Sequence, residues 1–345
     1  QLNCGGGKMK RGLYSKKFVL SLLLILTASI IFSGCGSKTS SNTPNIAYYS
    51  YYSDPITDWD PSSEAANGYI VLNNVYDTLL RYNPQENKII NVLAENYTKS
   101  DDGLVWTFNI RKGVKFHDGS EVNADAVKFS IDRTKSIGKG MSYLWDPVDK
   151  IDVIDNYTVQ FTLKYPAALD LIACSGYAAY IMSPKSVSAN SSDWLSQGNE
   201  AGSGPYKLES FKKGEQVVLT KFQDYWKGWN GKHFDKVVIK RDAEPSTRRE
   251  LIEKGDADIT MGLTPEDIKS LQNNSKVQVI TQPCFEDLFI FFNTENATLN
   301  NKTLRQALCY AFPYDDAVKY GIGGLAKQST GNVPNGLWGH SDNLP

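Results

Sequence analysis

Rapid alternation of secondary-structure signals between Asn74 and Arg133 constrains this chain more than any other feature of its sequence. Apolar residues at i, i+3, i+4 and i+7 predict one buried helical face that reaches Arg81, formed by Leu72, Val75, Tyr76 and Leu79. After an Asp101-Asp102-Gly103 turn, alternating apolar side chains predict a strand with one buried face, made by Trp106, Phe108 and Ile110. Asn123 then caps a predicted helix from Ala124 to about Arg133. The stretch predicts a small α+β module, and its spacing arranges no residues for catalysis.

Composition is that of an ordinary globular protein. The 345 residues are 41% hydrophobic, and 37 basic side chains balance 38 acidic ones, which gives a net charge of -1. This length allows two or three cores at about 100–200 residues per domain. The small net charge gives no reason to expect nucleic acid or another strongly charged partner. The 19 Tyr and 7 Trp suit a protein that binds by stacking and apolar contact, although filling cores explains most of them.

The N-terminal region has the pattern of a bacterial export signal. Four basic residues, Lys10, Arg11, Lys16 and Lys17, precede the apolar run 18–32, which is shorter than the roughly 20 residues of a transmembrane helix. Ser33-Gly34-Cys35 follows and resembles a lipobox, although Phe32 departs from its usual aliphatic residue. We therefore predict that Cys35 becomes the lipidated N-terminus; a plain signal peptide with an incidental cysteine is the alternative. Residues 1–8 precede Met9, the predicted start, and 36–45 form a predicted flexible tether.

A longer resemblance lies in residues 94–133, which read AENYTKSDDGLVWTFNIRKGVKFHDGSEVNADAVKFSIDR. This ordered string resembles the signature region of the bacterial extracellular solute-binding proteins, family 5, which serve peptide, dipeptide and nickel ABC importers. Residues 202–206, GSGPY, resemble the Gly-x-Gly-Pro-Tyr turn of the same family, and their spacing differs from the Gly-x-Ser-x-Gly elbow of hydrolases. The resemblance covers about 46–345.

The resemblance implies an α/β fold, a two-lobed clamshell like that of class II periplasmic binding proteins, with an extra small α+β domain. It implies that 46–66 and 193–283 form domain I, that 67–192 form the small domain II, and that 284–345 begin domain III. Family members continue beyond the position of Pro345, so we expect a truncated C-terminal lobe. Apolar runs also predict strands at 46–52, 277–280 and 288–293, and a helix around Leu304–Ala311 that is capped near Asn300 or Asn301.

The resemblance also implies a set of ligand neighbours, which are Ser53, Asp54, Ile56, Thr57, Tyr143, Trp145, Phe285 and Asp287. The first four follow the strand 46–52, at the position of the family's cleft, and an ordinary surface loop is the alternative. The two aromatic residues lie where members place an aromatic ring against the ligand, and burial in the small domain is the alternative. The last two lie at the crossing into domain III. The acidic residue that pairs with a peptide's amino terminus in many members falls beyond this chain.

No cofactor or metal site is predicted. Cys174, Cys284 and Cys309 form no Cys-x-x-Cys pair, and the histidines His117, His233 and His340 lack metal-ligand spacing. Some relatives have a disulfide that starts at the position of Cys284; an unpaired buried thiol is the alternative. Residues 321–326, GIGGLA, follow a predicted helix rather than a strand, so they predict a loop and not a dinucleotide site.

The resemblance implies a function in non-covalent binding of a solute. A lipid-anchored, monomeric receptor on the extracellular face of a bacterial cytoplasmic membrane, or the periplasmic face in a Gram-negative cell, captures peptides by hinge closure and delivers them to an ABC permease. Nickel complexes, oligosaccharides and a peptide pheromone with a signalling role are alternative ligands. A secreted hydrolase is the alternative from another class, but the sequence offers no nucleophile, base and orienting group together by motif. We therefore predict that the protein is not an enzyme.

Overall fold

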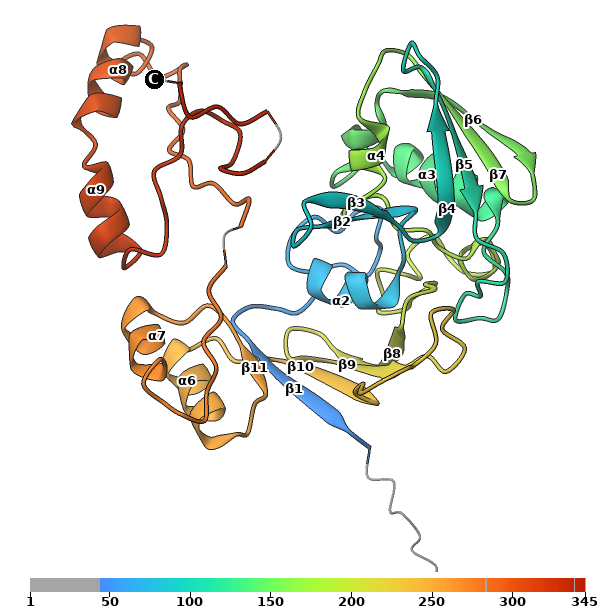
Figure 1. Ribbon diagram of the computed structural model, residues 1–345, viewed down its shortest axis with the longest axis horizontal. Helices are drawn as coiled ribbons and strands as arrows, with labels where there is room; N and C mark the ends of the chain where they lie inside the picture. Colours follow the sequence, from blue (N-terminus) through green and yellow to red (C-terminus); the bar gives the residue numbers. More distant parts are fainter. Residues whose placement is uncertain (1–43, 283, 338, 345) are drawn as a thin grey trace, which may run out of the picture. The chain divides into compact units, whose positions relative to one another are not determined.

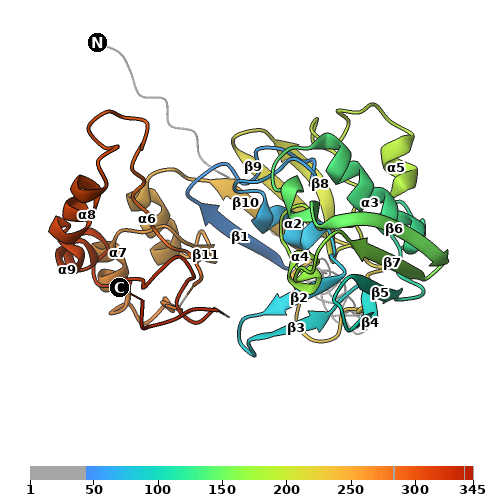
Figure 2. The same cartoon turned by 90° about the horizontal axis from the view of Figure 1, so that it is seen from above.

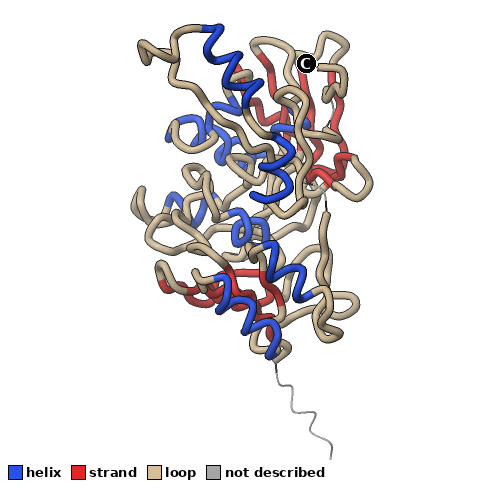
Figure 3. The backbone as a smooth tube through the Cα atoms, turned by 90° about the vertical axis from the view of Figure 1, so that its left-hand side faces the viewer, coloured by secondary structure: helices blue, strands red, loops and turns tan. Residues whose placement is uncertain are grey.

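The computed structural model describes residues 44–282, 284–337 and 339–344 (Figure 1). The predicted signal peptide, its lipidation site Cys35 and most of the predicted tether lie outside the described residues. Among the residues that are described, no helix combines the length and the apolar character needed to cross a membrane. The described strands, red in Figure 3, form a five-stranded, a four-stranded and a two-stranded sheet, and the buried apolar side chains form two clusters.

A five-stranded sheet has the order β11-β1-β10-β9-β8. Its strands, which come from distant parts of the chain, are β1 (Ile46–Tyr51), β8 (Tyr206–Lys212), β9 (Gln216–Lys221), β10 (Lys236–Arg241) and β11 (Ile259–Thr260). Strand β1 runs parallel to both of its neighbours, β10 and β11, whereas β8, β9 and β10 pair antiparallel. Because parallel strands need a crossover, helix α6 (Pro245–Lys254) connects β10 to β11.

A four-stranded antiparallel sheet has the order β4-β5-β7-β6. Its strands are β4 (Ala94–Lys99), β5 (Val105–Ile110), β6 (Val148–Asp155) and β7 (Thr158–Leu163). Helix α3 (Ala124–Ile137) lies along β6 and β7 (Figure 2). The predicted strand after the 101–103 turn and the predicted helix are confirmed, and Asn123 caps the helix by accepting a hydrogen bond from the amide of Ala126 at 2.9 Å.

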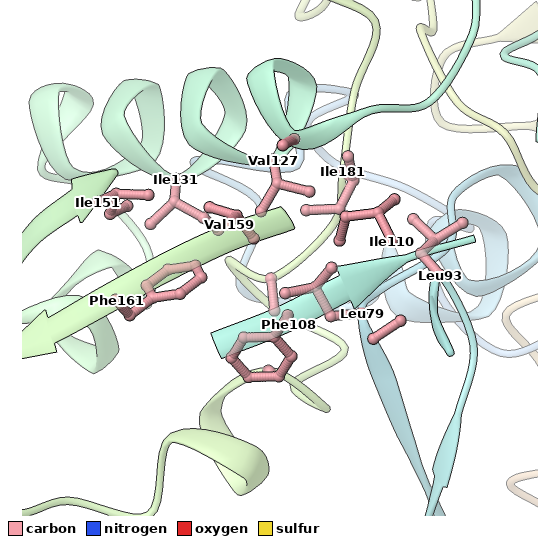
Figure 4. Close-up of a cluster of buried hydrophobic side chains, with 14 of the residues drawn as sticks. Leu79, Leu93, Phe108, Ile110, Val127, Ile131, Ile151, Val159, Phe161 and Ile181 are labelled. Carbon is pink, nitrogen blue, oxygen red and sulfur yellow. The ribbon is translucent and has the colours of Figure 1, made fainter. Parts of the chain in front are cut away.

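The core of the four-stranded sheet, here called the small-sheet core, follows from the alternation in its strands. Phe108, Ile110, Val159 and Phe161 are buried on the face that α3 covers with Val127 and Ile131 (Figure 4). The second cluster, the large-sheet core, joins the five-stranded sheet to helix α2 (Tyr69–Val75). Most of the buried apolar side chains belong to one of these two cores, and the predicted domain bounds stay a prediction.

The helix predicted to reach Arg81 is shorter than expected. Helix α2 ends at Val75, and Tyr76 already has an extended backbone, with φ -118° and ψ 155°. The apolar spacing continues through Leu79, but Leu79 is buried in the small-sheet core whereas Leu72 and Val75 are buried in the large-sheet core. The chain therefore leaves the helix to cross from one core to the other.

The strands predicted at 277–280 and 288–293 are also absent from the described part of the chain. A strand exists only where a neighbouring strand accepts and donates its backbone hydrogen bonds, and neither run is paired into a sheet of the described residues. The predicted C-terminal helix is confirmed as α8 (Lys302–Ala311), with Asn301 accepting from the amide of Leu304 at 3.2 Å. The predicted strand 46–52 is confirmed as β1.

Short elements complete the described chain. They are β2 (Leu80–Asn83), β3 (Lys88–Asn91), η1 (Ser142–Trp145), α4 (Leu169–Ile172), α5 (Pro184–Ser188), α7 (Pro265–Leu271), α9 (Tyr314–Asp316) and the turn η2 (Ala317–Gly321).

Truncating Phe161 to alanine tests the small-sheet core. The ring packs against Phe108 and Trp145, with centroids 5.5 and 6.1 Å away, so Phe161→Ala should lower the free energy of unfolding by about 3–5 kcal/mol in a urea titration. Ile154→Ala, on an exposed side chain of β6, should change it by less than about 0.5 kcal/mol. Equal losses for both variants would contradict this packing.

Candidate functional site

The candidate site lies at the carboxyl end of β1, where the chain leaves the five-stranded sheet. In open α/β sheets, ligands bind in the crevice outside the carboxyl ends of the strands. Five tyrosines converge there and are here called the phenol cluster: Tyr49, Tyr51, Tyr52, Tyr69 and Tyr177. The first three belong to β1 and its end, Tyr69 begins α2, and Tyr177 lies in the loop after α4.

Ring contacts join the phenol cluster in two groups, and Tyr69 of the second group is near enough to Tyr49 of the first to contribute, after burial, to its raised pKa. The ring centroids of Tyr49 and Tyr51 are 5.5 Å apart, and those of Tyr51 and Tyr52 are 4.6 Å apart. Tyr69 and Tyr177 make an edge-to-face pair at 6.3 Å. Tyr51 is fully buried, whereas Tyr52 is 40% exposed. The cluster therefore has a buried base and an exposed rim.

The hydroxyl groups of the cluster differ in their partners. Tyr177 donates to the carbonyl oxygen of Ala66 at 2.7 Å, and Tyr49 donates to the sulfur of Met261, also at 2.7 Å. The buried Tyr51 hydroxyl has no hydrogen-bond partner among the described residues. Burial, then the neighbouring phenols of Tyr69 and Tyr52, raise the pKa of Tyr49 to about 12. The environment thus favours neutral phenols.

The loop that follows β1 is held by a buried carboxylate. Glu64 accepts hydrogen bonds from the Thr57 hydroxyl and the Asp58 amide, both at 2.7 Å. It also accepts from the amides of Ala66 at 2.6 Å and Gly68 at 3.3 Å. Four donors on one buried carboxylate fix the path of the loop from the end of β1 to the start of α2.

A buried arginine holds the neighbouring strand ends. The Arg248 guanidinium, from α6, donates only to backbone carbonyl oxygens, those of Asp242, Ala243, Met261 and Gly262. Asp242 and Ala243 follow β10, and Met261 and Gly262 follow β11. Arg248 therefore ties together the two strand ends that flank β1, and it places Met261 against the hydroxyl of Tyr49.

Comparison with known proteins identifies the fold that holds this site. Residues 88–345 match the family model of bacterial extracellular solute-binding proteins, family 5 Middle. The chain belongs to this family. It is a family of solute-binding proteins and not of enzymes.

Two relatives show how far the similarity extends. The probable D,D-dipeptide-binding periplasmic protein DdpA of Escherichia coli (strain K12) is 33% identical over 282 residues, which are 79% of this chain and 54% of that protein. The glutathione-binding protein GsiB of Pectobacterium atrosepticum is 32% identical over 252 residues, 72% of this chain and 48% of that protein. The chain thus spans about half the length of the curated relatives it matches.

A solved structure of a family member has the same architecture. The ABC transporter-associated periplasmic binding protein DppA from Helicobacter pylori, in complex with the peptide STSA, aligns with a TM-score of 0.77 and 26% identity. The alignment covers 89% of this chain and 64% of that one. The fold is therefore of the α/β class II periplasmic-binding-protein type, as predicted.

Of the residues predicted in the loop after β1, three are held by polar contacts. Ser53 accepts a hydrogen bond from the Asn67 amide group at 3.0 Å, and Asp54 forms an ion pair with Arg241 at 3.3 Å. Thr57 donates to the buried Glu64, as described above. Ile56 is buried in the large-sheet core, so its side chain contributes to packing. All four adjoin the phenol cluster in sequence, and their contact with a ligand stays a prediction.

The structure places the two aromatic residues predicted near the ligand in different environments. Trp145 is buried in the small-sheet core, where it stacks on Phe161 and donates from Nε1 to the Ala178 carbonyl oxygen at 2.8 Å. Tyr143 is 58% exposed and donates to the sulfur of Met141 at 3.1 Å. Trp145 thus occupies the buried position that was the alternative to a ligand contact.

The two residues predicted at the crossing into domain III have partners outside the phenol cluster. Phe285 contacts the Tyr82 ring, with centroids 5.9 Å apart, and Asp287 accepts from the Ser329 hydroxyl at 3.4 Å. Between them, Glu286 is near enough to Tyr69 to contribute, after burial and Tyr52, to the raised pKa of Tyr69. Phe285 and Asp287 themselves contact Tyr82 and Ser329, outside the phenol cluster, and their contact with a ligand stays a prediction.

Sequence reasoning missed Tyr69, Tyr177 and Met261, which come from three separate segments. The high tyrosine content was the available signal, but it did not show which tyrosines converge. No group of three or more metal-ligating side chains occurs in the described ranges. Cys174, Cys284 and Cys309 are free thiols in the part of the chain that the structure describes.

The raised pKa of Tyr49 predicts a late step in an alkaline titration of phenolate absorbance. The folded-state pKa of about 12 lies above the ordinary tyrosine value of 10.0, so the neutral phenol of Tyr49 contributes stability fully below about pH 10, and this contribution is lost as the pH rises through about 12. Tyr49→Phe should remove one phenol from the latest part of the titration. Tyr165→Phe, on an exposed side chain, calibrates the absorbance of one residue. Loss of only early-titrating absorbance in Tyr49→Phe would contradict the burial of this group.

Proposed function

We propose that this protein is the substrate-binding component of an ABC importer, which captures peptides by hinge closure and delivers them to a membrane permease. The observation that carries the proposal is the phenol cluster, assembled from three segments at the carboxyl end of β1 with Glu286 near Tyr69. Relatives named for D,D-dipeptide and glutathione binding, and the peptide complex of the Helicobacter pylori protein, support the choice of peptides.

The chemistry of the cluster suits a peptide. Tyrosine rings offer apolar faces to side chains, and their hydroxyl groups donate to backbone carbonyl oxygens. The rim residue Tyr52 is 40% exposed, so its ring and hydroxyl are available to a ligand, whereas Tyr51 beneath it is fully buried and supports the rim by packing.

The domain organisation belongs to the same proposal. Residues 46–66 and 193–283 form domain I, 67–192 form domain II, and 284–345 begin domain III, so closure turns on the crossing near Phe285. Binding is non-covalent and the peptide is released unchanged. A lipid on Cys35 holds the monomeric receptor at the extracellular or periplasmic face of the membrane, near its permease.

Calorimetric titration of the full chain tests the proposal. The ligands are the peptide STSA, glutathione, a D,D-dipeptide and a library of other short peptides, with a nickel–histidine complex and a cello-oligosaccharide as alternative solutes. We expect heat of binding with a peptide and its recovery intact by mass spectrometry. Binding of only the nickel complex or the sugar would reject the peptide assignment, and recovery of a cleaved peptide would favour a hydrolase.

Variants of two tyrosines locate the binding surface. Tyr52→Ala removes the exposed ring of the phenol cluster and should weaken the affinity for the peptide about tenfold, as for other aromatic contact residues. Tyr165→Ala removes a ring of similar exposure outside the cluster and should leave the affinity unchanged. Equal affinities of the two variants would place the peptide elsewhere.

A further inference from the structure

The turn Phe116–Ser120, here called the signature turn, lies inside the string of residues by which the sequence resembles its family. The spacing of its residues in the sequence predicted no catalytic role for it. In the structure, Phe116 is buried in the small-sheet core, whereas the next two side chains reach out of that core. They contact the two parts of the segment 181–204, which returns the chain to the five-stranded sheet.

His117 holds the second part of this return segment. Its Nδ1 lies 2.8 Å from both carboxylate oxygens of Glu200, and its Nε2 lies 2.9 Å from the carbonyl oxygen of Gly204. The backbone amide of His117 donates to the Gly202 carbonyl oxygen at 2.8 Å. Both ring nitrogens face acceptors, and both side chains of the His117–Glu200 pair are almost fully buried. Removing one partner of such a buried pair strongly destabilises a protein, because the other partner stays buried without its hydrogen bond.

Asp118 holds the first part of the return segment, at Ser183 and Ser186. One carboxylate oxygen accepts from the hydroxyls of Ser183 and Ser186, each at 2.6 Å, and the other accepts from the amide of Ser120 at 2.8 Å. Burial acts to raise the pKa of Asp118, but the hydrogen bonds from these serines outweigh burial and lower it to about 2. The carboxylate therefore keeps its charge and its hydrogen bonds across the neutral pH range.

The segment 181–204, held in this way, lies against residues 75–77 at the end of α2. The amide of Gly204 donates to the Val75 carbonyl oxygen at 2.8 Å, and the amide of Ile181 donates to the Asp77 carbonyl oxygen at 3.0 Å. The crossing at 75–77 directly follows α2, which begins with Tyr69. The return segment at 181 lies four residues beyond Tyr177. The signature turn thus holds the return segment, which is itself hydrogen-bonded to residues 75–77. These two stretches begin six residues after Tyr69 and four residues after Tyr177.

We propose that His117 and Asp118 are positioning residues for the solute site: by holding the segment 181–204 against 75–77, they set the relative placement of Tyr69 and Tyr177. This inference rests on the proposed function only in taking the phenol cluster as the site. Neither residue touches the cluster in the contacts described above. Their effect is transmitted through the two crossing segments.

Hydrogen exchange of the full chain, measured by mass spectrometry without solute, provides the first test. His117→Gln and Asp118→Asn each remove charge-assisted hydrogen bonds and should speed amide exchange in 181–204 about tenfold or more, while β4 to β7 exchange at the wild-type rate. Asp132→Asn is the matched control, because Asp132 pairs with Lys128 at 2.7 Å on the exposed surface of α3. It should leave exchange in 181–204 unchanged.

Fluorine NMR with 3-fluorotyrosine separates positioning from stability. Tyr→Phe substitutions assign the signals. In His117→Gln and Asp118→Asn, the resonances of Tyr69 and Tyr177 should shift, whereas Tyr97, which stacks on Trp106 and Phe108 in the four-stranded sheet, should keep its resonance. A change in stability alone would leave the folded-state shifts of Tyr69 and Tyr177 unmoved.

Each outcome decides the inference. Faster exchange in 181–204 together with moved Tyr69 and Tyr177 resonances supports positioning. Unchanged exchange, or faster exchange with unmoved resonances, overturns it. If Asp118→Asn fails to fold, Ser186→Ala removes a single hydrogen bond from the same carboxylate and is subject to the same two readouts. Both measurements are made without solute, so a failure of the peptide titration rejects the proposed function and leaves this inference to be judged separately.

Discussion

The close contact between the backbone of Val75 and that of Gly202 and Gly204 is the constraint on which the rest of the structure depends. A Cβ atom on Gly202 would lie 1.9 Å from the Val75 carbonyl oxygen, and one on Gly204 would lie 2.6 Å from the Asn74 carbonyl oxygen. Any larger residue would force the two crossings apart. Val75 and Ala201 both belong to the large-sheet core, so this contact fixes the place where two distant segments of the chain meet beside that core.

Local signals in the sequence were sufficient for the elements within one core. Alternation identified β5, and side-chain caps identified the starts of α3 and α8, because each of these features depends only on near neighbours in the chain. The end of α2 could not be predicted in the same way. Its apolar spacing continues to Leu79, but the spacing does not tell which core will bury each residue.

The candidate site and the run 288–293 were less predictable for the same reason. The phenol cluster joins residues more than a hundred positions apart, and no local pattern records that they meet. The apolar run has the composition of a strand, yet Leu288 is 78% exposed and Phe291 is 87% exposed. Composition supplies the side chains of a strand, but only a neighbouring strand supplies its hydrogen bonds.

The signature turn explains why a strong family resemblance does not identify the solute. His117 and Asp118 bind backbone and side chains of the return segment, so the same residues would suit any member that keeps the two crossings together. The side chains at the carboxyl end of β1 come from other segments than the signature turn. Tyr52, Tyr69 and Met261 lie in or beside loops, where a substitution changes the surface offered to a ligand and leaves the crossings intact. With the phenol cluster as the proposed solute site, specificity would be set by this cluster and its surrounding loops, and it would be separable from the fold that carries them.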